Sequence, residues 1–227
     1  IADAVINEFC VNPGKLAVVP LATTLANETP DFEALHQLGI NRPYFLFVGT
    51  HEPRKNLMRL ITAYSRVEES LRDNMMLVIV GGKGWGDINP QKISADLGVE
   101  NNVRTLGFVS DATLAALYVK ALCLVLPSIY EGFGLPLVEA MSYGIPILTS
   151  NNSAMPEVAG DAALLIDPLD IDSIKLGLTH IMIDQNLRNR LATNATKNSE
   201  RFNWNKSTKK LVEVFKEAVV AKKEHQT

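Results

Sequence analysis

Cysteine is scarce in this 227-residue sequence, which contains only Cys10 and Cys123. Two thiols so far apart make neither a disulfide framework nor a zinc site, so a reducing compartment such as the cytoplasm is expected. No apolar run reaches the roughly 18 residues that a membrane-spanning helix needs. Charge of one sign is not in excess either, because 22 basic and 25 acidic residues give a net charge of −3. General nucleic-acid binding usually shows a basic stripe, so nucleic acid is not an expected partner.

Short apolar runs alternate with helical patterns through most of the chain. Most of the runs are apolar on both faces, as parallel strands covered by helices on both sides must be. The predicted strands are residues 44–48, 75–80, 103–106, 122–126, 145–149 and 163–166. The predicted helices between and after them include residues 56–71, 110–120, 136–143 and most of 187–223. This alternation predicts an α/β fold, a Rossmann-like parallel sheet flanked by helices.

The same patterns divide the chain into three segments. Residues 1–43 are predicted to be a linker that leads into the domain and holds one short strand at residues 16–19. Residues 44–202 contain the series of strands and helices that forms the Rossmann-like domain. Residues 203–227 are predicted to be a C-terminal helix, which follows a break near Asn203.

The segment PSIYEGFGLPLVEAM, residues 127–141, carries the clearest chemistry. It follows a predicted strand and opens a helix, and open α/β sheets bind ligands outside the carboxyl ends of their strands. Gly132 and Gly134 let the backbone approach a ligand closely, and the free N–H groups of the following helical turn suit a phosphate. Glu131 and Glu139 flank this turn, and their carboxylates suit the vicinal hydroxyls of a ribose or hexose. Taken alone, they are more often solvated acids at a strand–helix junction.

Five blocks in a fixed order resemble retaining glycosyltransferases of family four, which have the two-domain GT-B fold. The resemblance covers roughly residues 17–204 and matches the C-terminal, donor-binding half of that fold. The blocks are FVGTHEPRKNL, LVIVGGKGWGD, VRTLGFVSDATLAALYVKA, PSIYEGFGLPLVEAM and PEVAGDAALLIDP. The resemblance implies that the domain binds a nucleotide-diphosphate sugar for retaining transfer to an acceptor hydroxyl, in surface polysaccharide or glycolipid assembly. The EPRKNL segment is similar to mannosyl- or rhamnosyl-type enzymes, and GDP-mannose is the first guess for the donor.

The resemblance also implies roles for individual residues. Glu131 falls on the position that contacts the donor sugar near the reacting centre, so it is the expected catalytic residue. Glu139 falls on the position that holds the ribose hydroxyls. Other expected donor-binding positions lie in the glycine turn and in the loop beside the base: Gly132, Phe133, Gly134, Leu135, Phe108 and Val109.

Two cations complete the expected site. Lys55 falls on the family's lysine position, whereas the arginine that commonly follows the glycine is replaced by Thr50. Arg54 is the expected substitute. Charge builds on the leaving diphosphate as the glycosidic bond breaks, and these two side chains can neutralise it. No metal and no other cofactor is therefore expected.

A complete enzyme of this class needs a second Rossmann-like domain, which we expect to precede Ile1 and to contact a saccharide or lipid-linked acceptor. This chain alone is then expected to bind the donor without completing transfer. Association with the inner face of a membrane would come through the acceptor or the other domain. The alternative is a non-catalytic nucleotide-sugar-binding module. Cleft roles also stay open for His51 and for Lys83, whose glycine-rich loop lacks the spacing of a P-loop.

Overall fold

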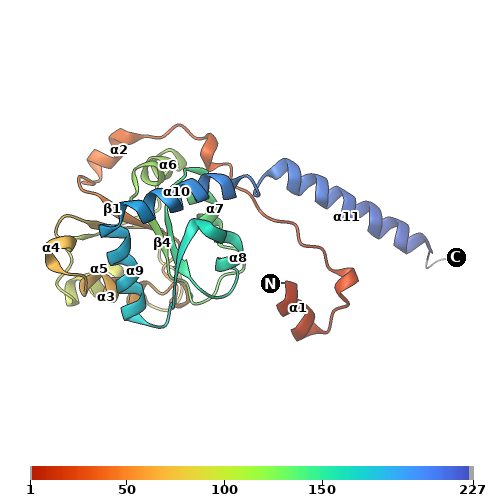
Figure 1. The fold of residues 1–227 in the computed structure, drawn as a ribbon, viewed down its shortest axis with the longest axis horizontal. Coiled ribbons are helices and arrows are strands. Elements are labelled where there is room, and N and C mark those ends of the chain that lie inside the picture. The colour runs from red at the N-terminus through yellow and green to blue at the C-terminus, as the bar shows by residue number, and fades with distance from the viewer. Residues whose placement is uncertain (1, 225–227) are drawn as a thin grey trace.

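A computed structural model describes residues 2–224 of the chain, and the side chains of residues 2–220. Six strands form one parallel sheet in the order β3-β2-β1-β4-β5-β6 (Figure 1). They are β1 (Tyr44–Val48), β2 (Met76–Val80), β3 (Val103–Gly107), β4 (Cys123–Leu126), β5 (Ile147–Ser150) and β6 (Ala163–Ile166). Every residue of β2, β4 and β5 is buried, as the apolar runs require. The predicted Rossmann-like fold class is confirmed.

Helices cover both faces of this sheet (Figure 1). On one face lie α3 (Leu57–Ser65), α5 (Pro90–Asp96) and α9 (Ile171–Ile183). The other face carries α2 (Phe32–Gln37), α6 (Asp111–Lys120), α7 (Leu135–Ser142) and α10 (Gln185–Ser199). The short helix α8 (Met155–Ala159) packs against β5 and β6. The core therefore lies in two layers, one on each side of the sheet.

The helix predicted over residues 56–71 is wrong as a single element. The structure has α3, which ends at Ser65, and a separate short helix α4 (Glu69–Arg72). Arg72 folds back and donates from Nη1 to the Ser65 carbonyl oxygen at 2.7 Å, which satisfies one of the free carbonyls at the end of α3. The contact joins residues seven positions apart, so the spacing of apolar residues along a helix could not predict it.

The short strand predicted at residues 16–19 is also wrong. Those residues belong to no strand in the described part of the chain and are not part of the six-stranded sheet. The linker instead begins with α1 (Ala2–Phe9) and later contains α2. Asp31 caps α2 by accepting from the Ala34 N–H at 3.2 Å, and Leu35 packs into the core. The latter part of the predicted linker is thus built into the domain.

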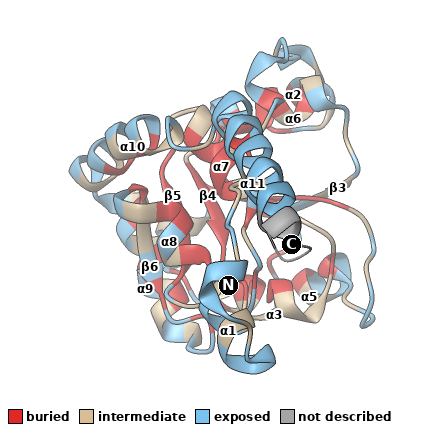
Figure 2. Ribbon diagram, turned by 90° about the vertical axis from the view of Figure 1, so that its right-hand side faces the viewer, coloured by how far each residue is buried: buried red, intermediate tan, exposed pale blue. Residues whose placement is uncertain are grey.

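The last helix, α11 (Trp204–Glu224), extends away from the body of the domain (Figure 1). Figure 2 shows it exposed along most of its length. The predicted break near Asn203 is confirmed, since α10 ends at Ser199 and α11 begins at Trp204. The final three residues of the predicted C-terminal helix lie outside the described residues. Among the helices of residues 2–224, none is long and apolar enough to cross a membrane.

Candidate functional site

The strand order reverses between β1 and β4, which are neighbours in the sheet although they are far apart in the sequence. In doubly wound sheets, ligands bind in the crevice outside the carboxyl ends of the strands at such a reversal. Two loops begin there. One follows β1 and contains the 3₁₀ turn Pro53–Lys55, and the other follows β4. The Ile129 N–H donates to the Arg54 carbonyl oxygen at 2.7 Å and joins the two loops.

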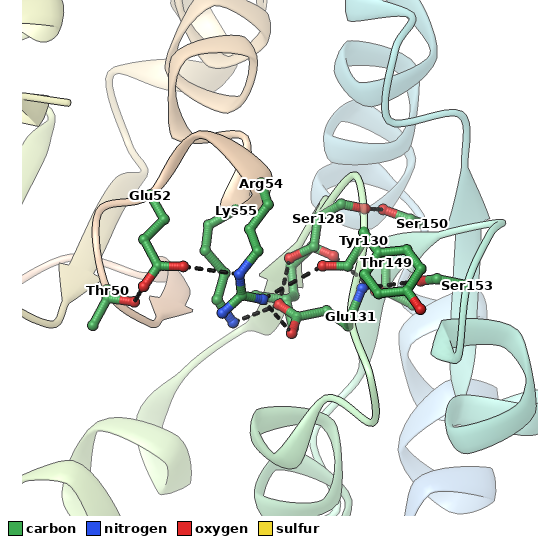
Figure 3. A network of polar contacts seen from close by, with 11 residues as sticks. Thr50, Glu52, Arg54, Lys55, Ser128, Tyr130, Glu131, Thr149, Ser150 and Ser153 are labelled. Carbon is green, nitrogen blue, oxygen red and sulfur yellow. Dashed lines mark hydrogen bonds and ion pairs between the residues drawn. The ribbon is translucent and has the colours of Figure 1, made fainter. Parts of the chain in front are cut away.

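Three predicted site residues meet in this crevice (Figure 3). Lys55 forms an ion pair through Nζ with Oε1 of Glu131, and Arg54 Nη1 lies 2.8 Å from Oε2 of the same carboxylate. Glu131 is 6% exposed and Lys55 is 7% exposed, so this pairing takes place almost out of water. Burying ions is costly unless they are paired and hydrogen-bonded, and here both carboxylate oxygens have cationic partners. The structure therefore places two positive charges and one buried carboxylate in the crevice where the strand order reverses.

Serine side chains complete the surroundings of Glu131 (Figure 3). The Ser128 hydroxyl donates to Oε1 at 2.9 Å, and the Glu131 N–H donates to Ser153 Oγ at 3.3 Å. Ser150 in turn donates from Oγ to the Ser128 carbonyl oxygen at 2.6 Å. These bonds fix the orientation of the carboxylate from the ends of β4 and β5.

Thr50, at the position where the family commonly has arginine, takes part in the same network. Its hydroxyl donates to Oε1 of Glu52 at 2.6 Å, and Glu52 Oε2 pairs with Nε of Arg54 at 2.8 Å. The Thr50 hydrogen bond, followed by the charges of Arg54 and Lys55, lowers the pKa of Glu52. Arg54 is thus held between two carboxylates, and Glu52 is its fixed outer partner.

Asn56 holds the cationic loop in place. It adopts a left-handed backbone with φ of 64°, and its buried side chain donates from Nδ2 to the carbonyl oxygens of Pro127 at 3.0 Å and Pro168 at 2.6 Å. Asparagine tolerates this conformation better than most residues. One side chain therefore ties the loop after β1 to the ends of β4 and β6.

The turn that opens α7 depends on glycine. Gly134 has φ of 86°, and a Cβ there would lie 2.5 Å from Met155 Cε, so a larger residue would be strained and would clash. By contrast, a Cβ on Gly132 would meet no atom of the chain within 4 Å. Packing thus requires Gly134, whereas the space in front of Gly132 is open.

Glu139 lies further along α7 and has different surroundings. Its Oε2 accepts a hydrogen bond of 2.7 Å from the hydroxyl of Tyr118 on α6. Burial raises the pKa of Glu139, Asp111 raises it further, and the Tyr118 hydrogen bond opposes the shift. With Leu135, Glu139 lines a pocket of about 410 Å³ that is separate from the Glu131 cluster.

The remaining predicted residues are spread along the same edge. The Phe108 ring is 80% exposed and lies over Gly82, where a Cβ would come within 2.2 Å of it. Val109 packs against the core. Phe133 makes an edge contact with Phe202, with ring centroids 5.7 Å apart, and lines a second cavity of about 690 Å³ together with Gly132. The structure thus brings Arg54, Lys55 and Glu131 into contact, whereas Phe108 and Phe133 lie outside this cluster.

Several polar residues of the site were missed by the sequence prediction. Ser128 lies inside the glycine-turn block and could have been noticed there. Residues 153–157 were predicted only as a helix start facing the cleft, and Tyr118 gave no signal, because its contact crosses between elements. His51 is 6% exposed, and its Nε2 has no hydrogen-bond partner within the described part of the chain. Burial lowers its pKa. No cluster of three His, Cys, Asp or Glu residues suited to a metal ion occurs in the described region.

The order of this sheet is Rossmann-like and matches one domain of GT-B glycosyltransferase structures. The chain superposes on sucrose-phosphate synthase from Thermosynechococcus elongatus with a TM-score of 0.81, at 23% identity, over 96% of this chain and 56% of the other. It also matches the glycosyl transferases group 1 family over residues 31–198. The chain therefore belongs to that family.

Two curated relatives are mannosyltransferases. O-antigen chain mannosyltransferase B of Escherichia coli is 37% identical over 173 residues, which are 76% of this chain and 45% of the relative. MMP alpha-(1->4)-mannosyltransferase of Mycolicibacterium hassiacum is 32% identical over 222 residues, which are 96% of this chain and 52% of the relative. The chain thus spans about half the length of each.

Proposed function

We propose that this chain is the domain of a retaining glycosyltransferase that binds the nucleotide-diphosphate sugar donor. The observation that carries this proposal is the convergence of Lys55 and Arg54 on the buried Glu131 at the strand reversal. A diphosphate entering this crevice would meet two fixed cations, a sugar would meet the carboxylate, and the open space before Gly132 would admit both.

The proposed chemistry follows from these charges. As the bond between the sugar and the diphosphate breaks, negative charge grows on the leaving group, and pre-positioned cations stabilise it. The sugar then develops oxocarbenium character, which a nearby carboxylate favours. The acceptor hydroxyl attacks from the face that the diphosphate leaves and gives its proton to the departing phosphate oxygen. Arg54 and Lys55 supply the charge that a metal would otherwise supply, so the proposed reaction needs no metal and no cofactor.

We propose mannose as the transferred sugar, because both relatives described above are mannosyltransferases. The E. coli relative is named for the O-antigen chain, which supports surface polysaccharide as the product class. The proposed location is the cytoplasm, with contact to the inner face of the membrane through a lipid-linked acceptor or through another domain.

A second domain is part of the proposal, since a cleft between two domains is needed to hold donor and acceptor together. Apolar side chains of α11 support it, because Leu211, Phe215 and Val219 lie 40%, 60% and 56% exposed along the helix. This chain alone is therefore expected to bind the donor without transferring the sugar.

Isothermal titration of the chain with UDP, GDP, dTDP and ADP, in a buffer with chelator, tests the proposal. We expect one nucleotide to bind, and Lys55→Met and Arg54→Met each to weaken it by about tenfold, which corresponds to about 1.4 kcal/mol. The exposed Lys92 provides the matched control Lys92→Met, which should leave binding unchanged. Glu131→Gln should keep nucleotide binding, since Glu131 is assigned to the sugar.

Two results would contradict the proposal. Binding of none of the four nucleotides at millimolar concentration would remove the donor site. Binding that is the same in the Lys55, Arg54 and Lys92 variants would place the nucleotide elsewhere on the molecule.

A further inference from the structure

Tyr118 is a completely buried tyrosine whose hydroxyl donates a hydrogen bond to Glu139. It has 0% exposure on α6, between the sheet and α7, and its hydroxyl donates to Oε2 of Glu139 at 2.7 Å. Burial of a phenol is favourable only when its hydroxyl finds a partner. The burial of Tyr118 thus requires a partner for its hydroxyl, and the partner it has is the carboxylate assigned to the ribose.

Tyr143 fixes the orientation of the Tyr118 ring. The two rings stack with centroids 5.6 Å apart and an interplanar angle of 11°. The Tyr143 hydroxyl donates to the Leu25 carbonyl oxygen at 2.7 Å, so this second ring is anchored to the linker segment. Stacking and anchoring leave the Tyr118 hydroxyl little freedom to point anywhere except at Glu139.

The other oxygen of Glu139 remains available. Within the described residues, Oε1 accepts no hydrogen bond, and the side chain lines the pocket of about 410 Å³. Thr24, Leu25, Asp111 and Trp204 form other parts of its wall. The pocket therefore presents one bound and one unbound carboxylate oxygen to whatever enters it.

We propose that Tyr118 is a positioning residue that aims Glu139 at the two ribose hydroxyls of the donor. With Oε2 held by the phenol, Oε1 points into the pocket and accepts from the ribose, while Oε2 retains a lone pair for the second hydroxyl. This inference rests on the proposed function, because it gives the ribose a defined place in the same donor site.

The phenol also opposes protonation of Glu139. Burial and the negative charge of Asp111 raise the pKa of Glu139, and the hydrogen bond from Tyr118 lowers it. Glu28 also lines the pocket. Burial raises the pKa of the neighbouring Tyr143, and the charges of Glu139 and Glu28 raise it further. A protonated Glu139 accepts ribose hydroxyls poorly, so donor affinity should fall as the pH is lowered. Without the Tyr118 hydroxyl the pKa of Glu139 should rise further, so the loss of donor affinity should begin at a higher pH.

Titration of wild-type chain and Tyr118→Phe tests the inference, using the nucleoside diphosphate that binds and its 2′,3′-dideoxy analogue. We expect Tyr118→Phe to weaken the ribonucleotide by about tenfold, the usual range for a hydrogen bond to a charged group. The dideoxy analogue should bind both proteins equally, because it has no ribose hydroxyls. Affinity for the ribonucleotide should fall at a higher pH in Tyr118→Phe than in the wild type.

Tyr64→Phe is the matched control, because it removes another buried tyrosine hydroxyl, which donates to the Met75 carbonyl oxygen at 2.9 Å and does not contact Glu139. It should keep the wild-type preference for the ribonucleotide. Glu139→Asp withdraws the carboxylate from Tyr118 and should lose that preference even if Tyr118→Phe does not fold. Thermal unfolding of each variant reports on folding.

The inference fails if Tyr118→Phe weakens both nucleotides equally, which would mean a structural role only, or if it weakens neither. Failure of the proposed function looks different, because the wild-type chain would then bind no nucleoside diphosphate. That result would overturn the inference as well.

Discussion

Glu131 and Glu139 are eight positions apart in the sequence but lie in opposite electrostatic environments. Glu131 forms ion pairs with Lys55 and Arg54 and accepts a hydrogen bond from a serine hydroxyl. Glu139 is buried and accepts from the Tyr118 phenol as its one donor among the described residues, and Asp111 nearby opposes its charge. Two carboxylates whose surroundings differ in this way suit two tasks, one at the sugar and one at the ribose.

The raised pKa of Glu139 has a consequence for stability. In the unfolded chain its pKa is near the ordinary value of 4.5, and in the folded chain burial raises it. The stability that this group contributes is complete below the unfolded pKa and is lost as the pH rises through the folded pKa. Ionised Glu139 therefore costs stability at neutral pH.

We accordingly predict that Glu139→Gln unfolds at a higher temperature than the wild type at pH 8, with a smaller difference at pH 4.5. Thermal unfolding followed by circular dichroism at the two pH values measures this. The exposed Glu157 supplies the control, and Glu157→Gln should show no such dependence. A Glu139→Gln variant that is less stable than the wild type at pH 8 would show that the Tyr118 contact outweighs burial.

At the scale of single residues, the sequence located the glutamate pair through the block PSIYEGFGLPLVEAM and the two cations through the block FVGTHEPRKNL, each with its resemblance. Arg54 was predicted to substitute for the arginine missing at Thr50 from its charge and from the resemblance to the subgroup with an EPRKNL segment. The structure places Arg54 against Glu131 and gives Thr50 a different partner, Glu52. Tyr118 was not predicted, because a tyrosine at helical spacing in LAALYVKA looks like core, and its partner is 21 residues away.

At the scale of elements, α11 differs from every other long helix of the domain. α7 and α10 pack against each other, whereas α11 contacts the body near its start, where Ser207 donates to the Pro20 carbonyl oxygen at 2.7 Å. An isolated helix owes little to intrinsic propensity, because most helical stability in proteins comes from packing of an apolar face. On this physical ground we expect α11 to be the least stable of the long helices in this chain.

Hydrogen exchange tests this. We predict that amides of residues 211–220 exchange much faster than those of α7 in this chain, since opening α11 disrupts few buried contacts. Exchange measured by mass spectrometry, peptide by peptide, gives the comparison. Slow exchange in α11, comparable to α7, would show that the helix is stable without a second domain and would weaken the argument for one.

The elements that sequence patterns predicted best were the buried strands, whose apolar runs admit few other interpretations. Sequence patterns mispredicted elements where a contact between distant residues decides whether a helix or strand forms. Arg72 ends α3 from a neighbouring turn, and residues 16–19 lack a partner strand that no local pattern can supply. The helix α5 was missed although Asn89 and Pro90 form an N-cap and first-turn signal.

At the scale of the whole molecule, the reversal of strand order between β1 and β4 is the feature that makes a site. It brings a cationic loop and an acidic loop, about 76 residues apart, to one crevice. Asn56 then ties three strand ends together around it. The sequence predicted the strands and the residues, but the order of strands, and hence this meeting, came from the structure.

The most direct test of the donor site is saturation-transfer difference NMR of the chain with an equimolar mixture of GDP-mannose, UDP-glucose and ADP-glucose. We predict saturation of one compound alone, GDP-mannose, at its ribose and anomeric protons, with loss of the signal on adding GDP. Saturation confined to another sugar nucleotide would keep the donor site and contradict mannose. No saturation of any of the three would contradict the account of this domain as the donor-binding half of a glycosyltransferase.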